Sequence, residues 1–281
     1  KRMRQSVPFD TPIPQSTFST NIIMKIAIFV AALSHSAVWA FAPNSRGNVR
    51  PSAAQVRPLA SLVDINENSE RGLGSMDEWA TACGVQRAGG FQLTTEDGRD
   101  FSVMTTESLP AGSPVLYVPN GMILSTSKAR EELRELGNIQ DAVEQLNRLG
   151  ANDQVPRFYL YVKILVEYER GDQSPYFPWL NAMPRMYFNA VSMTDFCYEC
   201  LPPLVFALSR AERVKSDNFF DVLQKVDFLS PTTKSNNELS KWAYNVVTTR
   251  CWGPEEDKLI IPMADMVRAI YQSLHACPPS I

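Results

Sequence analysis

Histidine is scarce in this chain. The 281 residues contain two histidines, His35 and His275, which stand near the two ends of the sequence. The long stretch between them has no imidazole to act as a general base or to ligate a metal. This excludes Ser-His-Asp and Cys-His nucleophilic centres and a histidine-ligated zinc site there. Any chemistry in this stretch must proceed without a histidine base.

A cysteine framework is also missing. The five cysteines are irregularly spaced, unlike the even pattern of a disulfide-stapled domain. Cys197-Tyr-Glu-Cys200 is a lone CxxC with no second pair and no histidine nearby. Two ordinary thiols are favoured over a metal site, so no metal is expected.

Positive charge is not in excess. The formal net charge is −3, with 27 Lys and Arg against 30 Asp and Glu. The chain therefore lacks the polybasic footprint of a nucleic-acid-binding protein, and no nucleic-acid partner is expected. The hydrophobic content of 44% is sufficient for a true core, in one large or two modest domains.

The first forty residues predict a targeting segment. Met24-Lys25 gives a basic start, and the apolar run 26–33 follows, with Val38-Trp39-Ala40 as the cleavage site. Because this run is too short to span a bilayer, residues 24–40 are predicted to be a signal peptide. Residues 1–23 are expected to be translated sequence upstream of the true start. The mature chain is expected to have no transmembrane segment.

A basic stretch follows the cleavage site. From Phe41 to Val63 there are three arginines and no acidic residue, which is typical of a transit peptide. The combination resembles the bipartite presequences of proteins imported into secondary plastids. We expect residues 41–78 to be a disordered transit-like segment and linker, and the location to be a plastid. A secreted protein with a disordered start is the alternative.

Globular sequence is predicted from Trp79, and short strands come first. The segments 101–104 and 115–118 are short and apolar, and turn formers such as Asp97-Gly98 separate them. They read as strands and hairpins within 84–124.

The segment that follows is predicted to be helical. Residues 125–149 are charged and Leu-spaced, with Ser127 as the cap of the first helix. A stronger helix opens at Pro156, runs through Arg170 and ends at Gly171. Residues 172–184 are expected to form an extended, packed loop. Further helices are predicted at 201–213, 218–228 and 237–247, and a buried strand at 259–262. The order indicates an α+β fold, a β core with a helical insertion at about 125–247.

Three motifs carry a family resemblance. They are Pro175-Tyr-Phe-Pro-Trp-Leu-Asn-Ala-Met-Pro184, Trp242-Ala-Tyr-Asn-Val-Val-Thr-Thr-Arg250 and Ile261-Pro-Met-Ala-Asp265. In this order and spacing the chain resembles SET-domain protein methyltransferases of the Rubisco large-subunit methyltransferase type, over about residues 79–266. The resemblance implies a SET-type β core interrupted by helices. It also implies transfer of a methyl group from S-adenosylmethionine to a lysine of a protein, such as Rubisco or another plastid protein.

The resemblance also implies roles for individual residues. Arg250 would pair with the cofactor carboxylate, a task suited to a fixed guanidinium. The backbone carbonyls of Thr249 and Arg250 would accept from the substrate nitrogen, and Asp265 would support this junction. The cofactor loop of the family would fall at Asp100, Phe101 and Ser102. Without the resemblance, Arg250 reads as a surface ion-pair partner after a helix.

The sequence departs from the family pattern after Met266. The family continues with Asn-His, whereas this chain reads Arg268-Ala269, and the catalytic tyrosine and the helical substrate-binding domain are missing. Residues 267–281 show no family pattern, and we hypothesise that they are translated from an unspliced intron. We therefore assign no catalytic residue and expect a SET domain that is incomplete at its C-terminus and inactive as given. A non-catalytic SET-like protein-binding module is the alternative, and an unrelated helical adaptor is a third interpretation.

Overall fold

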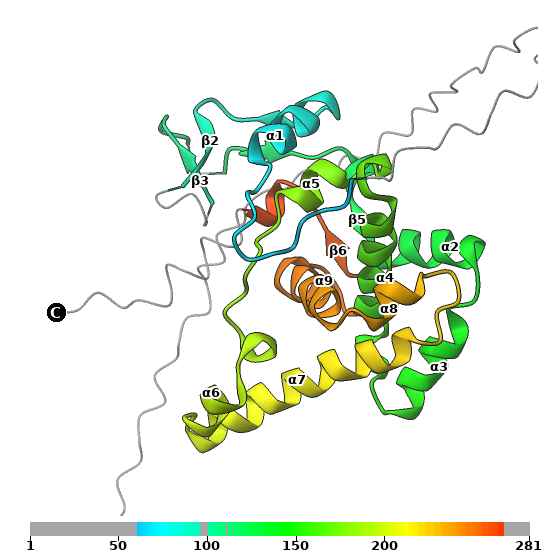
Figure 1. The fold of residues 1–281 in the computed structure, drawn as a ribbon. Coiled ribbons are helices and arrows are strands. Elements are labelled where there is room, and N and C mark those ends of the chain that lie inside the picture. The colour runs from blue at the N-terminus through cyan, green and yellow to red at the C-terminus, as the bar shows by residue number, and fades with distance from the viewer. Residues whose placement is uncertain (1–60, 96–100, 111, 267–281) are drawn as a thin grey trace, which may run out of the picture.

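The structure is a computed structural model that describes residues 61–95, 101–110 and 112–266 (Figure 1). In these ranges it is built of helices and short strands. The α-helices are α1 Leu73–Ala82, α2 Thr126–Leu136, α3 Gln140–Arg148, α4 Val155–Arg170, α5 Phe177–Asn181, α6 Asp195–Glu199, α7 Pro203–Leu223, α8 Pro231–Ser235 and α9 Asn237–Arg250. The 3-10 helices are η1 Asn120–Met122, η2 Asn152–Gln154, η3 Gly171–Gln173 and η4 Ala190–Ser192.

The strands form three antiparallel pairs within the described ranges. They are β1 Gln86–Arg87 with β4 Leu116–Tyr117, β2 Phe91–Thr94 with β3 Ser102–Thr105, and β5 Leu124–Ser125 with β6 Leu259–Ile260. In the last pair Leu124 lies opposite Ile260. All the helices from α2 to α9 lie between these two strands in sequence, so the pairing closes a helical insertion. The predicted α+β order of strands, helices and a returning strand is confirmed.

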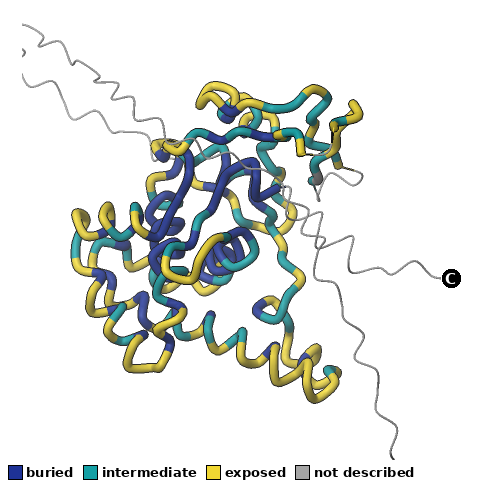
Figure 2. Tube along the Cα trace, turned by 180° about the vertical axis from the view of Figure 1, so that it is seen from behind, coloured by how far each residue is buried: buried dark blue, intermediate teal, exposed yellow. Residues whose placement is uncertain are grey.

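Helix α4 runs through the centre of the core. Pro156 occupies its first turn, where a missing N–H costs nothing, and Gly171 ends it at a φ of 53°. Every residue from Phe158 to Glu167 is buried, as expected for a helix that is apolar on nearly all sides (Figure 2). Both predicted boundaries of this helix are confirmed.

Helices α7 and α9 pack their aromatic residues against α4. The Phe219 ring of α7 lies edge-on to Phe158 and to Tyr244, with centroid distances of 5.2 and 5.3 Å. The Tyr161 hydroxyl shares a hydrogen bond of 2.7 Å with Ser240 at the start of α9. The N-terminal part of α7 runs away from this cluster and is largely exposed (Figures 1 and 2).

Four local expectations were wrong. Helix α7 is continuous where two helices, 201–213 and 218–228, were predicted, because Phe219 packs against α4 and α9 and holds the helix through its polar middle. The predicted loop 172–184 contains η3 and α5, which has Pro178 in its first turn. Ser125, not Ser127, caps α2 by accepting from the Lys128 N–H at 3.2 Å.

The fourth concerns the expected disordered linker. Part of it is ordered, since Val63 is buried and α1 begins at Leu73 and buries Met76. The rest of the proposed presequence, residues 1–60, and the tail 267–281 lie outside the described residues. The predictions for 1–23, 24–40 and 41–60 therefore stay predictions.

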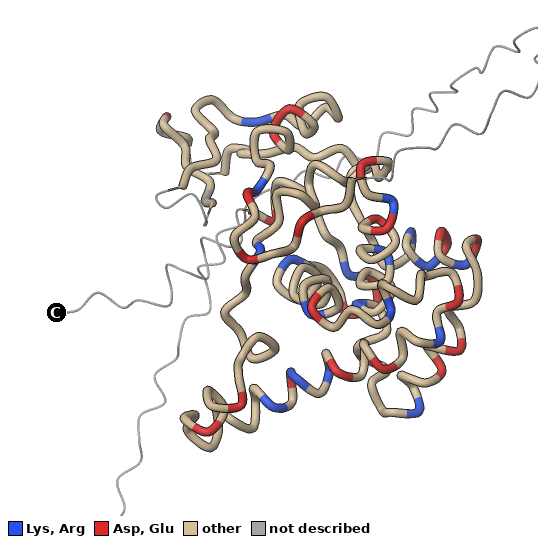
Figure 3. Tube along the Cα trace, in the orientation of Figure 1, with Lys and Arg blue, Asp and Glu red and all other residues tan. Residues whose placement is uncertain are grey.

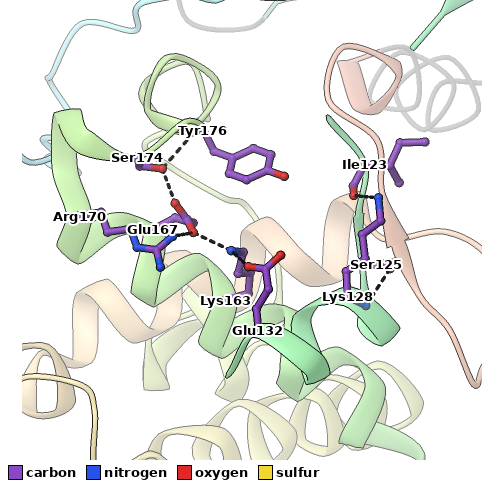
Figure 4. A network of polar contacts seen from close by, with 9 residues as sticks. All are labelled: Ile123, Ser125, Lys128, Glu132, Lys163, Glu167, Arg170, Ser174 and Tyr176. Carbon is purple, nitrogen blue, oxygen red and sulfur yellow. Dashed lines mark hydrogen bonds and ion pairs between the residues drawn. The ribbon is translucent and has the colours of Figure 1, made fainter. Parts of the chain in front are cut away.

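A buried charged network joins α4 to its surroundings (Figure 4). Glu167, only 1% exposed, accepts from Lys163 at 2.7 Å and from Arg170 at 2.6 Å. Lys163, itself 4% exposed, also contacts Glu132 of α2. Because buried charges are tolerated only when paired, these contacts fix the relative positions of the two helices.

The network continues into the segment that carries α5. Ser174 donates its hydroxyl to the second carboxylate oxygen of Glu167 and accepts from the Tyr176 N–H at 3.0 Å (Figure 4). Tyr176 immediately precedes α5, and Trp179 stands one turn further on. The position of α5 is therefore anchored to the charged network of α4.

Surface charge is mixed in sign. Acidic and basic residues alternate along α2, α3 and α7, and neither gathers on one face in this view (Figure 3). None of the helices in the described part of the chain is both long and apolar enough to cross a bilayer.

Candidate functional site

Arg250 and Asp265 form a buried ion pair. Arg250 is the last residue of α9 and 5% exposed, and Asp265 lies in a helical turn after β6 and is 1% exposed. The guanidinium Nη1 donates to Asp265 Oδ2 at 3.0 Å. Burial of both partners excludes the surface ion pair that was the alternative for Arg250.

Trp179 holds the same carboxylate oxygen from a third element. Its indole Nε1 donates to Asp265 Oδ2 at 3.1 Å, and the side chain of this α5 residue is fully buried. Oδ2 thus receives two donors, one of them charged. Sequence reasoning placed Trp179 in a family motif but gave it no contact with Asp265, because the two residues are 86 positions apart.

Three polar atoms of this cluster are buried without a hydrogen-bond partner in the structure. They are Arg250 Nε, Asp265 Oδ1 and the Tyr187 hydroxyl. Buried polar atoms are normally paired, and each unpaired one costs about 1–3 kcal/mol. The cluster therefore retains unused donors and an unused acceptor at one place, which suits a ligand group that carries both charges.

Electrostatics keeps these groups in defined protonation states. Burial alone would lower the pKa of Arg250, but the Asp265 carboxylate and Tyr187 outweigh burial and raise it. Burial raises the pKa of Tyr187, although the neighbouring Arg250 charge opposes the change. The site thus offers a cationic guanidinium and a neutral phenol near neutral pH.

A cleft of about 860 Å³ lies beside the cluster. Its walls come from the segment 63–67, the segment 185–189 and the first half of α9. The lining is completed by Tyr168 of α4 and by Ser192, Met193 and Cys197. Tyr187 belongs both to this wall and to the neighbourhood of Arg250, and so connects the cleft to the buried ion pair.

The end of α9 matches the expected position of the substrate acceptors. Thr249 donates its hydroxyl to the Asn245 carbonyl at 2.7 Å, which holds its side chain against the helix. The last carbonyls of an α-helix have no intrahelical partner, and those of Thr249 and Arg250 are among them. Their role toward a substrate nitrogen stays a prediction.

The predicted cofactor loop is only partly described. Asp100 lies outside the described residues, and Ser102 is the first residue of β3. The half-buried Phe101 ring lies under the Arg71 guanidinium, whose central carbon is 4.8 Å from its centroid. Arg71 also acts electrostatically on Tyr187, which lies beside Arg250. The role of residues 100–102 toward a cofactor stays a prediction.

The arrangement of short strands around a helical insertion is that of a SET-like fold. The chain is similar to the solved structure of Rubisco LSMT bound to AdoMet, with a TM-score of 0.52 and 12% sequence identity. The likeness covers 70% of this chain and 44% of that chain, so this chain spans less than half of the solved enzyme. At this identity the likeness shows the fold. No family model matches the sequence, and no curated protein matches it.

Proposed function

We propose that this chain binds S-adenosylmethionine in the manner of a protein-lysine methyltransferase. The observation that carries the proposal is the buried Arg250–Asp265 pair with its unused hydrogen-bonding atoms. Its position in a SET-like fold supports it, because the solved structure of similar fold is bound to AdoMet.

The unpaired atoms fit the amino-acid part of this cofactor. Its carboxylate would accept from Arg250, and its ammonium group would donate to the free oxygen of Asp265, two charge-assisted hydrogen bonds of opposite sense. A ligand with only one of these charges would leave a buried atom unsatisfied. When bound, the cofactor supplies a methyl group on a sulfonium, so the leaving group needs no acid and no histidine.

The substrate that we propose is a lysine side chain of a protein. A lysine must lose its proton before it accepts a methyl group, and desolvation beside the site would lower its pKa. The carbonyls of Thr249 and Arg250 are proposed as its acceptors. With the plastid address proposed for the presequence, the substrate would be Rubisco or another plastid protein.

We do not propose that these 281 residues turn over a substrate efficiently. The family resemblance places Asn-His after Met266, where the sequence has Arg268-Ala269. We propose that the chain binds the cofactor and transfers methyl groups poorly or not at all. A radiolabelled methyl-transfer assay on plastid extract tests this, and labelling of a protein by this chain would contradict it.

Calorimetry tests the binding itself. Titration of the full chain with S-adenosylmethionine should give saturable heat, and adenosine, which lacks the aminocarboxylate, should bind more weakly. Asp265→Asn should weaken S-adenosylmethionine binding and leave adenosine binding unchanged. Absence of heat at millimolar S-adenosylmethionine would refute the proposal.

A non-catalytic protein-binding module is the second candidate. Phe196, Leu204 and Leu208 on α6 and the first turns of α7 are 73%, 72% and 65% exposed, although all three are large and apolar. Exposed apolar groups of this kind mark interaction surfaces. The same titration separates the two candidates, because the binding module predicts no heat with S-adenosylmethionine.

A further inference from the structure

Tyr187 is held rigidly between two anchored neighbours. Arg185 donates to the Asn181 side chain at 2.9 Å and to the Glu70 carbonyl at 2.9 Å. Asn189 donates its side-chain amide to Asn245 of α9 at 2.7 Å. The backbone on both sides of Tyr187 is therefore fixed, and its hydroxyl is directed to one place.

That place offers the hydroxyl no acceptor in the protein. The buried hydroxyl lies beside the Arg250 guanidinium but makes no well-formed hydrogen bond. A guanidinium has donors only, so it cannot accept the phenolic proton. The positive charge also turns the O–H dipole away from Arg250, toward any anion that approaches both groups.

Two other tyrosines with buried side chains have acceptors for their hydroxyls. The Tyr198 hydroxyl donates to the Ala190 carbonyl at 2.7 Å, and the Tyr244 hydroxyl donates to Glu212 at 2.6 Å. A tyrosine that served only packing at position 187 would gain from losing its unpaired hydroxyl. The retained hydroxyl points to a partner that arrives with a ligand.

We propose that the Tyr187 hydroxyl donates a hydrogen bond to the ligand carboxylate that Arg250 binds, and so selects ligands that carry a carboxylate. This inference rests on the proposed function. Tyr187 also lines the cleft, and its buried hydroxyl lies beside Arg250, so this residue connects the cleft to the guanidinium.

The test compares two ligands and two proteins. S-adenosylmethionine and its decarboxylated analogue are titrated into the wild-type chain and into Tyr187→Phe. The lower end of the range for a hydrogen bond to a charged group corresponds to about tenfold in affinity, so the variant should bind S-adenosylmethionine at least about tenfold more weakly. Binding of the decarboxylated analogue should be the same in both proteins, because the carboxylate that the hydroxyl contacts is gone.

Stability in the absence of ligand gives a second readout. Tyr187→Phe should leave the melting temperature unchanged or raise it, because only an unpaired buried hydroxyl is lost. Tyr198→Phe is the matched control. It should lower the melting temperature, since the Ala190 and Ser209 carbonyls lose the hydroxyl donor of Tyr198, and it should leave cofactor affinity unchanged.

The negative results of these experiments can be distinguished from one another. Equal weakening of both ligands by Tyr187→Phe, or weakening of neither, would overturn the role of Tyr187 and leave the proposed function intact. A clear loss of stability in Tyr187→Phe would also overturn it, because the hydroxyl would then have a structural partner. Wild-type protein that binds no S-adenosylmethionine would overturn the proposed function and the role of Tyr187 together.

Discussion

Replacement of Glu167 by glutamine should strongly destabilise the protein. Glu167 is 1% exposed, and its two carboxylate oxygens accept from two cations and from the Ser174 hydroxyl. Glutamine keeps the size of the side chain but removes the negative charge and one acceptor oxygen. Lys163, 4% exposed, would keep its positive charge with only Glu132 to balance it.

The magnitude follows from this burial. Removing one partner of a buried pair typically costs about 3–5 kcal/mol. The Glu132 side chain is 51% exposed and well solvated, so it compensates Lys163 only in part. We therefore expect a loss near the lower end of the range, about 3 kcal/mol. For a domain of about 200 residues this corresponds to a fall in melting temperature of about 6–12 °C.

Urea unfolding followed by circular dichroism measures the change. The matched control is Glu144→Gln, which removes the same charge from an (i,i+4) pair with Arg148 on the surface of α3. Both side chains of that pair are well exposed, so the control should change stability by less than about 0.5 kcal/mol. If the two variants lost similar amounts of stability, the reasoning about the buried network would be wrong.

Two further predictions concern the site and the core. Trp179→Phe removes the indole donor to Asp265 and should weaken S-adenosylmethionine binding in calorimetry, whereas Trp79→Phe in α1, the same change without that bond, should not; equal effects would show that the bond is irrelevant. Burial raises the pKa of Tyr176 to about 12, and burial also raises that of Tyr161 above its ordinary value. Unfolded tyrosines lose their proton near pH 10, so the stability contributed by these neutral phenols is complete below pH 10 and is lost as the pH rises toward 12. Tyrosinate absorbance at 295 nm should therefore rise together with loss of circular dichroism; ionisation of both rings in the folded protein would contradict this.

Local signals in the sequence predicted much of the fold. The proline at the start of α4 and the glycine at its end act within one turn, so both boundaries of this helix could be placed. The middle of α7 could not, because its polar residues look alike in a solvated helix and in a break. Its continuity is decided by Phe219 and its neighbours, which pack against α4 and α9.

The candidate site, too, was only partly predictable from the sequence. Arg250 and Asp265 stand in short motifs that the sequence displays, and the structure joins them in one ion pair. Trp179 and Tyr187 contribute through their tertiary position. The sequence placed Trp179 in a motif of the family resemblance without assigning it a role in the site, and no sequence signal distinguished Tyr187 from other tyrosines.

The closure of the fold and the assembly of the site are one event. The segment after Arg250 turns back through an antiparallel bridge between Trp252 and Leu259, and this return delivers Asp265 to the end of α9. The same segment includes β6, which pairs with β5 although the whole helical insertion separates the two strands in sequence. The ion pair therefore joins the end of α9 to the segment that closes the helical insertion. Because the protein aligns Arg250, Asp265 and Trp179 before any ligand arrives, a ligand need not order them, and preorganisation of this kind strengthens binding.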